Sequence, residues 1–185
     1  MTLADLADRY WDIRNEYSPT TATVIGVHDF DDRLRRFDDD WLGEIETRFA
    51  AVADEARALD PSGFTTQERI SRELLIYEAS TLAAEIRSRY LVGPIDPFLG
   101  PHTRILGDTR QNTVADRSQA DLLLRRYELV PSYLESALDL HRANAAAGMT
   151  PAMAPVERVL GQLDAYVDSP LDSDPFLALK VPGEA

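Results

Sequence analysis

The sequence contains no cysteine, and this absence excludes several chemistries at once. Disulfide bonds, thiolate nucleophiles and thiolate metal sites all require a cysteine sulfur. Histidine is scarce as well, with only His28, His102 and His141 in 185 residues. The zinc-protease signature His-Glu-x-x-His is missing, as are the Glu-x-x-His pairs of di-metal helical bundles. The sequence therefore predicts no metal site, no cofactor and no catalytic residue within this chain.

Other familiar motifs are missing too. The chain has no Gly-x-Ser-x-Gly elbow, no phosphate-binding glycine loop and no dinucleotide-binding fingerprint. Serine hydrolase and nucleotide-binding functions therefore lose their usual support.

Basic residues are few relative to acidic ones, with 19 lysines and arginines against 32 aspartates and glutamates, a net charge of −13. Such a surplus repels the phosphate backbone of nucleic acids and anionic lipid headgroups. No apolar run approaches the roughly 20 residues of a membrane span. The start, MTLADLADRYW, lacks the basic and apolar regions of a signal peptide. We expect no nucleic-acid partner, no membrane partner and a cytoplasmic location.

What the sequence does contain is helical periodicity. Apolar residues recur at steps of three and four over most of the chain, and no strand pattern is found. We predict an all-α fold, an irregular array of six or seven helices, the longest near residues 38 to 59, 66 to 90 and 119 to 147. Pro131 interrupts the last of these and predicts either a kink or two abutting helices. Residues 1–168 are predicted to form one helical domain, and residues 169–185 an extended, weakly ordered tail.

Several residues have the pattern of helix starts. Ser18 before Pro19 offers a capping hydroxyl and a ring that fits the first turn. Thr65 with Glu68 forms a capping box, and Ser118 with Asp121 has a similar spacing. On the third helix and the fourth we expect one apolar face each. For the fourth helix the predicted apolar face comprises Ile70, Leu74, Tyr77, Thr81, Leu82, Ile86 and Tyr90.

The stretch Leu91–Asn112, LVGPIDPFLGPHTRILGDTRQN, separates two long helical patterns and holds three prolines and three glycines. Long structureless connections are uncommon in compact helical domains and often bind ligands. The ligand-facing candidates in this loop are Gly100, Pro101, His102 and Arg104. The alternative for the histidine is that it only caps a helix end or bonds a carbonyl group inside the fold.

The turn after the second helix gathers a histidine and several carboxylates. These residues are His28, Asp29, Asp31 and Asp32. A calcium loop needs ligands at alternating positions and a late bidentate glutamate, and this order is absent. We therefore predict a solvated acidic loop whose carboxylates pair with Arg33, Arg35 or Arg36. His141 lies on the apolar side of its helix, so we expect a hydrogen-bonded core histidine there.

Three segments together resemble a known family. They read YWDIRNEYSPTTATVIGVHDFDDRL, RELLIYEASTLAAEIRSRYLVGPIDPFLGPHTRIL and LLRRYELVPSYLESALDLHRANAAAGMTPAMAPVERVLGQLD. They combine a Tyr-Trp opening, a Ser-Pro helix, a Gly-x-x-x-x-Asp-Asp-Arg turn, a Gly-Pro-His loop and a late Gly-x-x-Pro step. This order is similar to the N-terminal part of the bacterial domain-of-unknown-function 885 (DUF885) family, whose longer members look like zinc-dependent peptidases of the gluzincin type.

The resemblance implies no catalytic or metal residue in this chain. The family's presumed metal site is a His-Glu segment ending in Pro-Gly-His, with a later Glu-Gly-Trp, and neither occurs here. Gly100, Pro101 and His102 match the family's Gly-Pro-His loop, which implies that this loop faces the cleft of the complete protein.

We therefore expect the N-terminal helical region of a zinc peptidase-like protein, one that shapes substrate access and lacks the metal-binding half. Zinc and a peptide substrate are implied only for the full-length protein. Such a half exposes an apolar face, so it would bind the missing C-terminal half or self-associate. The alternative is a stand-alone, non-catalytic helical interaction module or a truncated relic.

Overall fold

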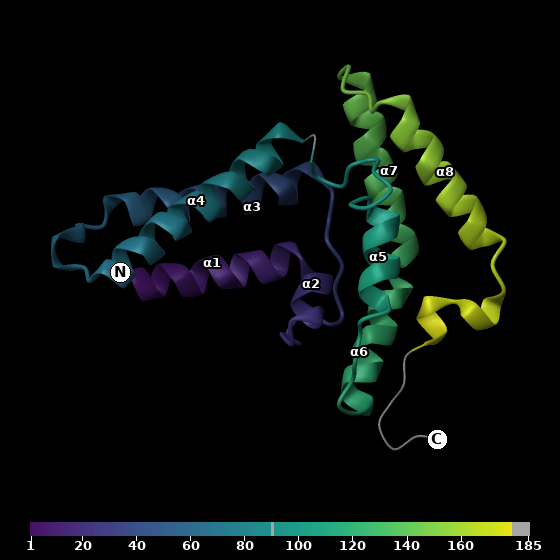
Figure 1. Cartoon of the computed structure of the whole chain (residues 1–185), viewed down its shortest axis with the longest axis horizontal. Helices are drawn as coiled ribbons and strands as arrows, with labels where there is room; N and C mark the ends of the chain where they lie inside the picture. The colour runs from purple at the N-terminus through teal and green to yellow at the C-terminus, as the bar shows by residue number, and fades with distance from the viewer. Residues whose placement is uncertain (90, 179–185) are drawn as a thin grey trace. The chain divides into compact units, whose positions relative to one another are not determined.

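The computed structural model describes residues 1–89 and 91–178, and it confirms the all-α fold (Figure 1). No strand occurs in these residues. Their α-helices are α1 (Leu3–Tyr17), α2 (Pro19–Val24), α3 (Asp39–Ala58), α4 (Thr66–Ser88), α5 (Pro101–Thr109), α6 (Arg117–Glu128), α7 (Val130–Ala146) and α8 (Met153–Val167). Three single-turn 3₁₀ helices are η1 (Pro61–Gly63), η2 (Leu171–Ser173) and η3 (Pro175–Leu177).

The helices group into two compact units, each built from two segments of the chain. The first unit comprises Met1–Tyr17 and Asp38–Val92 and holds α1, α3 and α4. The second comprises Ser18–Phe37 and Gly93–Ala185 and holds α2 and α5 to α8. Compact units can still belong to one folding domain, so the single domain over residues 1–168 stays a prediction.

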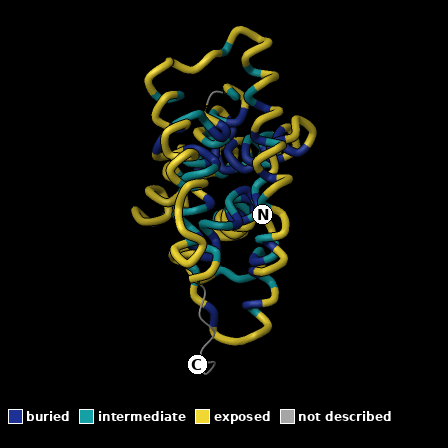
Figure 2. Tube along the Cα trace, turned by 90° about the vertical axis from the view of Figure 1, so that its right-hand side faces the viewer, coloured by how far each residue is buried: buried dark blue, intermediate teal, exposed yellow. Residues whose placement is uncertain are grey.

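In the first unit, α1, α3 and α4 pack side by side around an aromatic centre (Figure 1). The ring of Tyr17 lies 6.0 Å from that of Trp41, nearly parallel, and 6.1 Å from that of Phe49, edge to face. Such geometries suit the charge distribution of aromatic rings. The apolar spacing predicted for α3 is confirmed, since Ile45, Phe49 and Val52 are all buried. Figure 2 shows the trace of the chain coloured by burial, with buried positions in its middle part and exposed positions toward the outside.

Local helix signals are confirmed in this unit and partly wrong elsewhere. The Thr65 hydroxyl accepts from the backbone N–H of Glu68 at 3.2 Å, and the Glu68 carboxylate accepts from the N–H of Thr65 at 2.8 Å, as in a capping box. The helix start predicted at Ser18 and Pro19 is confirmed, but the Ser18 side chain makes no capping hydrogen bond, and its hydroxyl accepts one from Arg35 at 2.8 Å. The cap of α6 is Asp116 rather than Ser118, and its carboxylate accepts from the N–H of Gln119 at 3.0 Å.

The apolar face predicted for α4 is wrong in its first half and right at Ile86, which is buried, while Tyr90 lies outside the described residues. The first three of its members, Ile70, Leu74 and Tyr77, are 57%, 56% and 65% exposed. The face that packs is a neighbouring one, formed by Leu75, Ala79, Ala83 and Ile86. Two of these four positions are small alanines, and α4 packs on α3, whereas Ile70, Leu74 and Tyr77 remain on the outer surface. α4 therefore has two apolar faces, and its own unit covers one.

In the second unit, the break at Pro131 takes the form of two abutting helices, one of the two alternatives predicted. Leu129 alone separates α6 from α7, and it ends the first helix and precedes the second. Pro131 lies in the first turn of α7, where its missing N–H costs no hydrogen bond. This break and the additional helix α5 explain why the described residues contain eight α-helices instead of six or seven.

The long loop predicted for Leu91–Asn112 is wrong in its second half, because residues 101 to 109 form α5. Pro101 opens the helix at a position where proline is well tolerated, and Ile105 and Thr109 provide a buried side four residues apart. A nine-residue helix offers too few turns for a clear periodic pattern. The irregular connection is reduced to residues 91–100.

The segment predicted as an extended tail is partly structured. Residues 171 to 177 form η2 and η3, and the Asp174 carboxylate accepts from the N–H of Phe176 at 2.9 Å and from the hydroxyl of Tyr166 at 2.9 Å. The ring of Phe176 contacts that of Tyr127 edge to face, with 4.8 Å between centroids. The last seven residues of the predicted tail lie outside the described part of the chain.

A transmembrane segment is not found among the described helices, none of which combines the required length and hydrophobicity.

Candidate functional site

The four predicted ligand-facing residues lie at the start of α5, but they do not line one common cavity. Pro101 and Arg104 line a small pocket of about 20 Å³, which we call the Arg104 pocket. His102 instead lines a wider pocket of about 430 Å³ beside α8, the His102 pocket. Gly100 precedes α5 as its N-cap residue. That any of the four contacts a ligand stays a prediction.

The Arg104 pocket is basic and rich in hydroxyl groups. Its remaining lining residues are Ser18, Thr20, Thr21, Arg35, Phe37, Gly93, Leu99 and Tyr133. Two arginines thus line a cavity whose lining includes no aspartate or glutamate. The Arg35 guanidinium is held by its hydrogen bond to the Ser18 hydroxyl. Among the described residues, the Arg104 side chain has no hydrogen bond or ion pair, and it is exposed.

Tyr133 forms the back of the Arg104 pocket. Its buried hydroxyl donates to the backbone carbonyl of Pro101 at 3.3 Å, and its ring lies 5.2 Å from that of Phe37. Burial raises the pKa of Tyr133 to about 12, while the positive charges of Arg35 and Arg104 act in the opposite direction. Tyr133 is therefore neutral at pH 7.

Two glycines allow neighbouring atoms to approach closely, and the first of them lines the Arg104 pocket. Gly93 has a φ of +61°, and a Cβ atom there would lie 2.7 Å from Cε1 of Phe37. At Gly100, a Cβ atom would lie 2.5 Å from the backbone oxygen of Asp96. Only glycine fits either position without a shift of its neighbours. The Gly93 carbonyl lies 2.7 Å from Nε2 of half-buried His141, so the prediction of a hydrogen-bonded histidine is confirmed.

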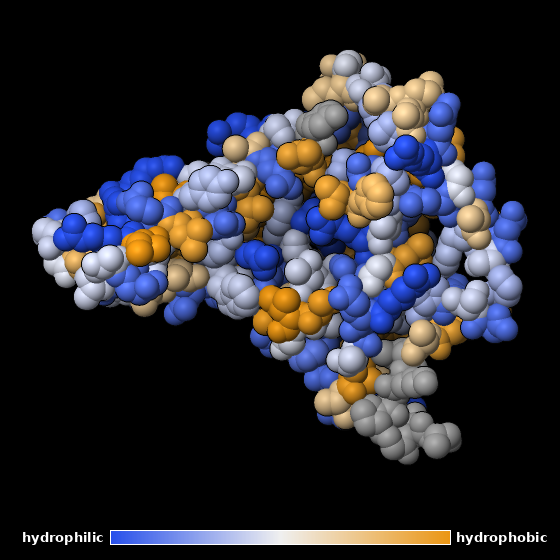
Figure 3. Space-filling model, viewed as in Figure 1, coloured by the Kyte–Doolittle hydropathy of each residue, from blue (hydrophilic) through white to orange (hydrophobic). Residues whose placement is uncertain are grey.

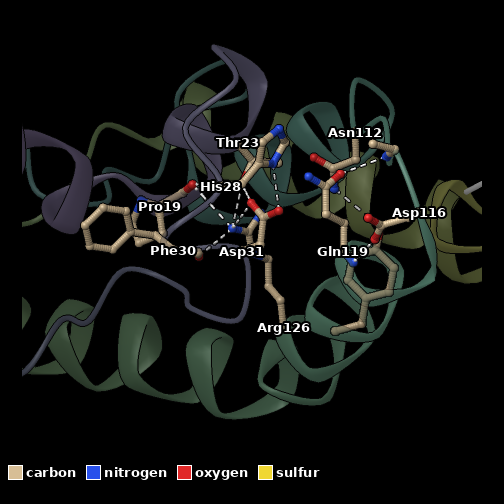
Figure 4. Close-up of polar contacts among 11 residues, drawn as sticks. Pro19, Thr23, His28, Phe30, Asp31, Asn112, Asp116, Gln119 and Arg126 are labelled. Carbon is tan, nitrogen blue, oxygen red and sulfur yellow. Dashed lines mark hydrogen bonds and ion pairs between the residues drawn. The ribbon is translucent and has the colours of Figure 1, made fainter.

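Next to α2 lies a buried arginine that the sequence analysis missed. Arg126 of α6 is 1% exposed. Its Nη2 donates to the Thr23 hydroxyl and to the Phe30 carbonyl, each at 2.7 Å, and is 3.4 Å from the Pro19 carbonyl. Figure 4 shows these groups converging on the guanidinium. One side chain of α6 thereby holds both α2 and the turn that follows it.

The counter-charge of Arg126 is Asp31, which is equally buried. Its Oδ1 lies 3.8 Å from Nη2 of Arg126 and accepts from the Thr23 hydroxyl at 2.6 Å (Figure 4). Its Oδ2 is 2.8 Å from Nδ1 of His28. The predicted solvated acidic loop is thus wrong for this residue, because a cation 95 positions later in the chain draws it inward. Asp32 does pair with Arg33, at 3.5 Å, as predicted.

The electrostatics of Arg126 depend on more than Asp31. Burial lowers the pKa of its guanidinium, and the negative charges of Asp31 and Asp108 act against this shift. An arginine remains protonated in proteins even so. Its Nε and Nη1, like Oδ2 of Asp108, are buried and have no hydrogen-bond partner among the described residues. One signal in the sequence pointed to this site: Arg126 follows Ala120 and Leu123 at three-residue steps, which places a cation on the buried face of α6.

His102 joins two helices across the His102 pocket. Its Nε2 lies 3.0 Å from Oε1 of Gln162 in α8, and the Gln162 amide donates to the Pro97 carbonyl at 3.0 Å. The histidine therefore links α5 to α8. The described residues contain no group of three or more histidine, cysteine, aspartate or glutamate side chains that could hold a metal ion.

The buried pair leads to a stability prediction. Replacing Arg126→Met leaves the Asp31 carboxylate buried without its cation, which should lower the free energy of unfolding by about 3 kcal/mol. Because Asp31→Asn removes the stranded charge, the double variant should recover at least about 1 kcal/mol of this loss. Urea unfolding followed by far-UV circular dichroism measures both. The matched control is Arg125→Met, the exposed neighbour in α6, which should change stability by less than about 0.5 kcal/mol. A loss as small in R126M as in R125M would contradict this assignment.

Tyr133 leads to a prediction about alkaline pH. Its pKa of about 12 lies above the value of about 10 for an unfolded tyrosine, so folding favours the neutral phenol. The resulting stabilisation is complete below pH 10 and is lost as the pH rises toward 12. Wild type should lose about 2 kcal/mol more than Tyr133→Phe over this interval, in urea titrations at fixed pH. Equal losses would show that Tyr133 ionises at its ordinary pKa. Tyr10→Phe serves for comparison, since burial also raises the pKa of Tyr10.

Comparison with known proteins gives one finding. The chain matches the family described as "Bacterial protein of unknown function (DUF885)" over residues 19–184. No curated protein and no solved structure matches it. The matched range contains α2, the Asp31 turn, the Gly-Pro-His segment and Arg126, and therefore every residue of both pockets except Ser18. Because the match spans most of the sequence, this chain belongs to the DUF885 family.

Proposed function

We propose that this chain is the helical, substrate-access and scaffold region of a zinc-dependent, peptidase-like protein, and that other residues of that protein bind the metal. The observation that carries the proposal is the uncovered apolar face of α4. Family membership and the resemblance of Gly100, Pro101 and His102 to a cleft-facing loop support it.

The uncovered face of α4 has the character of a packing surface. Ile70, Leu74 and Tyr77 follow one another at steps of four and three, so they lie on one side of the helix, and each is more than half exposed. Figure 3 shows hydrophobic side chains on the outer surface of this unit. Complete burial of one such side chain stabilises by about 1.5 to 3 kcal/mol. A helix that already packs on one apolar face gains from a second only if another surface covers it.

A similar surface occurs in the second unit on α8. Leu160 and Val167 are seven residues apart on this helix and are 55% and 79% exposed. Among the described residues of α8, Val159 is the one that is buried. Each unit therefore exposes hydrophobic side chains along a helix, as expected of a region that packs against more protein.

The alternative, a stand-alone helical interaction module, would use the same surfaces. The two functions differ in what the genome encodes nearby. If the DNA downstream of this sequence encodes a His-Glu helix ending in Pro-Gly-His, with a later Glu-Gly-Trp, the peptidase-like function gains its metal site. A downstream region and neighbouring genes without that pattern would favour the interaction module.

The α4 surface can be tested directly. The triple variant changes Ile70, Leu74 and Tyr77 to glutamine and should keep the helix content of the wild type. Its self-association and its binding of a hydrophobic dye should both fall at least about threefold, because these side chains form the exposed apolar surface. Analytical ultracentrifugation and dye fluorescence measure the two effects. The control is Ser71→Gln with Glu73→Gln, two exposed polar positions of α4, which should leave both unchanged. A wild-type chain that is already monomeric and does not bind the dye would contradict the proposal.

Activity measurements test the assignment of the metal to another part of the protein. The isolated chain, supplied with zinc, should hydrolyse a mixed peptide library no faster than buffer, because no described cluster of ligands activates a water. Mass spectrometry of the library detects new termini, and metal analysis after dialysis measures bound zinc. Peptide turnover that a chelator abolishes, with one zinc per chain, would overturn the proposal.

A further inference from the structure

We infer that the Arg104 pocket binds the carboxylate group of a small organic acid that carries an apolar substituent. The proposed access role neither requires nor supplies this ligand. The inference depends on the charge, the size and the walls of the pocket.

Charge is the first argument. The Arg104 pocket brings two guanidinium groups to one small cavity in a chain whose net charge is −13. Arg35, Arg104 and Tyr133 all line this cavity, and the charges of both arginines act on the Tyr133 hydroxyl. The Asp108 carboxylate acts on Tyr133 in the opposite direction, and Arg126 also attracts it. Arg104 has no ion-pair partner among the described residues, so its positive charge remains for a ligand.

The geometry of the arginines favours an oxyanion. A planar guanidinium matches the two oxygens of a carboxylate, and the hydroxyls of Ser18, Thr20 and Thr21 add donors on the α2 side. Arg35 is fixed by the Ser18 hydroxyl. Arg104 is exposed and makes no polar contact with described residues, so it can turn onto a ligand without breaking an existing bond.

Size selects among oxyanions. The cavity of about 20 Å³ exceeds the roughly 10 to 15 Å³ that one water molecule needs, but not by much. A flat carboxylate fits such a space better than a tetrahedral phosphate or sulfate. Gly93 limits this width, because a Cβ atom at that position would collide with Phe37 and press on Pro101, two other residues of the lining.

The mouth of the pocket indicates what the carboxylate is attached to. Leu99 is 52% exposed and lines the cavity together with Phe37 and Pro101. An aliphatic group next to the carboxylate would cover Leu99 and gain the hydrophobic contribution of that contact. Two sources supply this chemistry, the C-terminal residue of a peptide and a free aliphatic acid.

The test is to titrate the whole chain with four probes. Isothermal titration calorimetry measures the binding, and the amide NMR signals of residues 99 to 104 locate it. The probes are N-acetyl-leucine, N-acetyl-leucine amide, 4-methylpentanoate and inorganic phosphate. We expect the carboxylates to bind and the amide to bind at least about tenfold more weakly, since it lacks the charge that pairs with arginine. Tighter binding of N-acetyl-leucine would identify a peptide end as the source, and tighter binding of 4-methylpentanoate a free acid.

Variants separate the pocket from general charge effects. Arg104→Gln removes an exposed side chain and should weaken carboxylate binding about tenfold or more. Arg110→Gln, an exposed arginine of the same region that does not line this pocket, should leave it within about twofold. Asp108→Asn removes the nearby negative charge and should tighten binding about two- to fivefold.

Four outcomes would overturn the inference. The first is that neither carboxylate shows saturable binding up to about 20 mM, a range that covers weak millimolar ligands. The second is that the amide binds as tightly as the carboxylates, and the third is that phosphate binds more tightly than either carboxylate. The fourth is that R110Q and R104Q lose carboxylate binding equally. Failure of peptide hydrolysis or of α4-mediated association would leave these results unaffected, so the two proposals fail separately.

Discussion

The second unit depends on one buried charge, the Arg126 guanidinium. Removing an ion from water is costly, and such an ion is retained only where hydrogen bonds and a counter-charge offset that cost. Thr23, Phe30 and Asp31 provide them from α2 and the turn behind it. Because each partner contributes a specific polar atom, the arginine fixes the position of this segment on α6 more sharply than an apolar contact of the same area would.

This constraint extends to the Arg104 pocket through α2. This short segment supplies Thr23 to the buried arginine, and it supplies Thr20, Thr21 and the preceding Ser18 to the lining of the pocket. A helix of six residues has little stability of its own in water. The buried network therefore orders the hydroxyl groups of the pocket, while the exposed apolar faces of α4 and α8 are left for contacts with more protein. The buried polar contacts thus hold the second unit together, while the exposed apolar faces serve the proposed scaffold role.

Sequence predicted the parts of this fold that local interactions determine. The capping box of Thr65 and Glu68 spans four residues, and the structure forms it as expected. The sequence could not reveal the partner of Asp31, because that cation lies in another helix and only folding brings it near. Periodicity also failed to choose between the two apolar faces of α4, since the choice depends on how closely α3 approaches its alanines. The pocket was located only in part: Arg104 was predicted, whereas Arg35 and the α2 hydroxyls come from a distant segment.

Hydrogen–deuterium exchange of Arg126→Met tests the central claim most directly. If the buried guanidinium orders α2 and its following turn, amides of residues 20 to 31 should exchange at least about tenfold faster in the variant, because local opening no longer breaks its hydrogen bonds. Amides of α3 and α4 should keep their wild-type rates. Unchanged exchange in residues 20 to 31, or an equal acceleration in α3 and α4, would contradict the account.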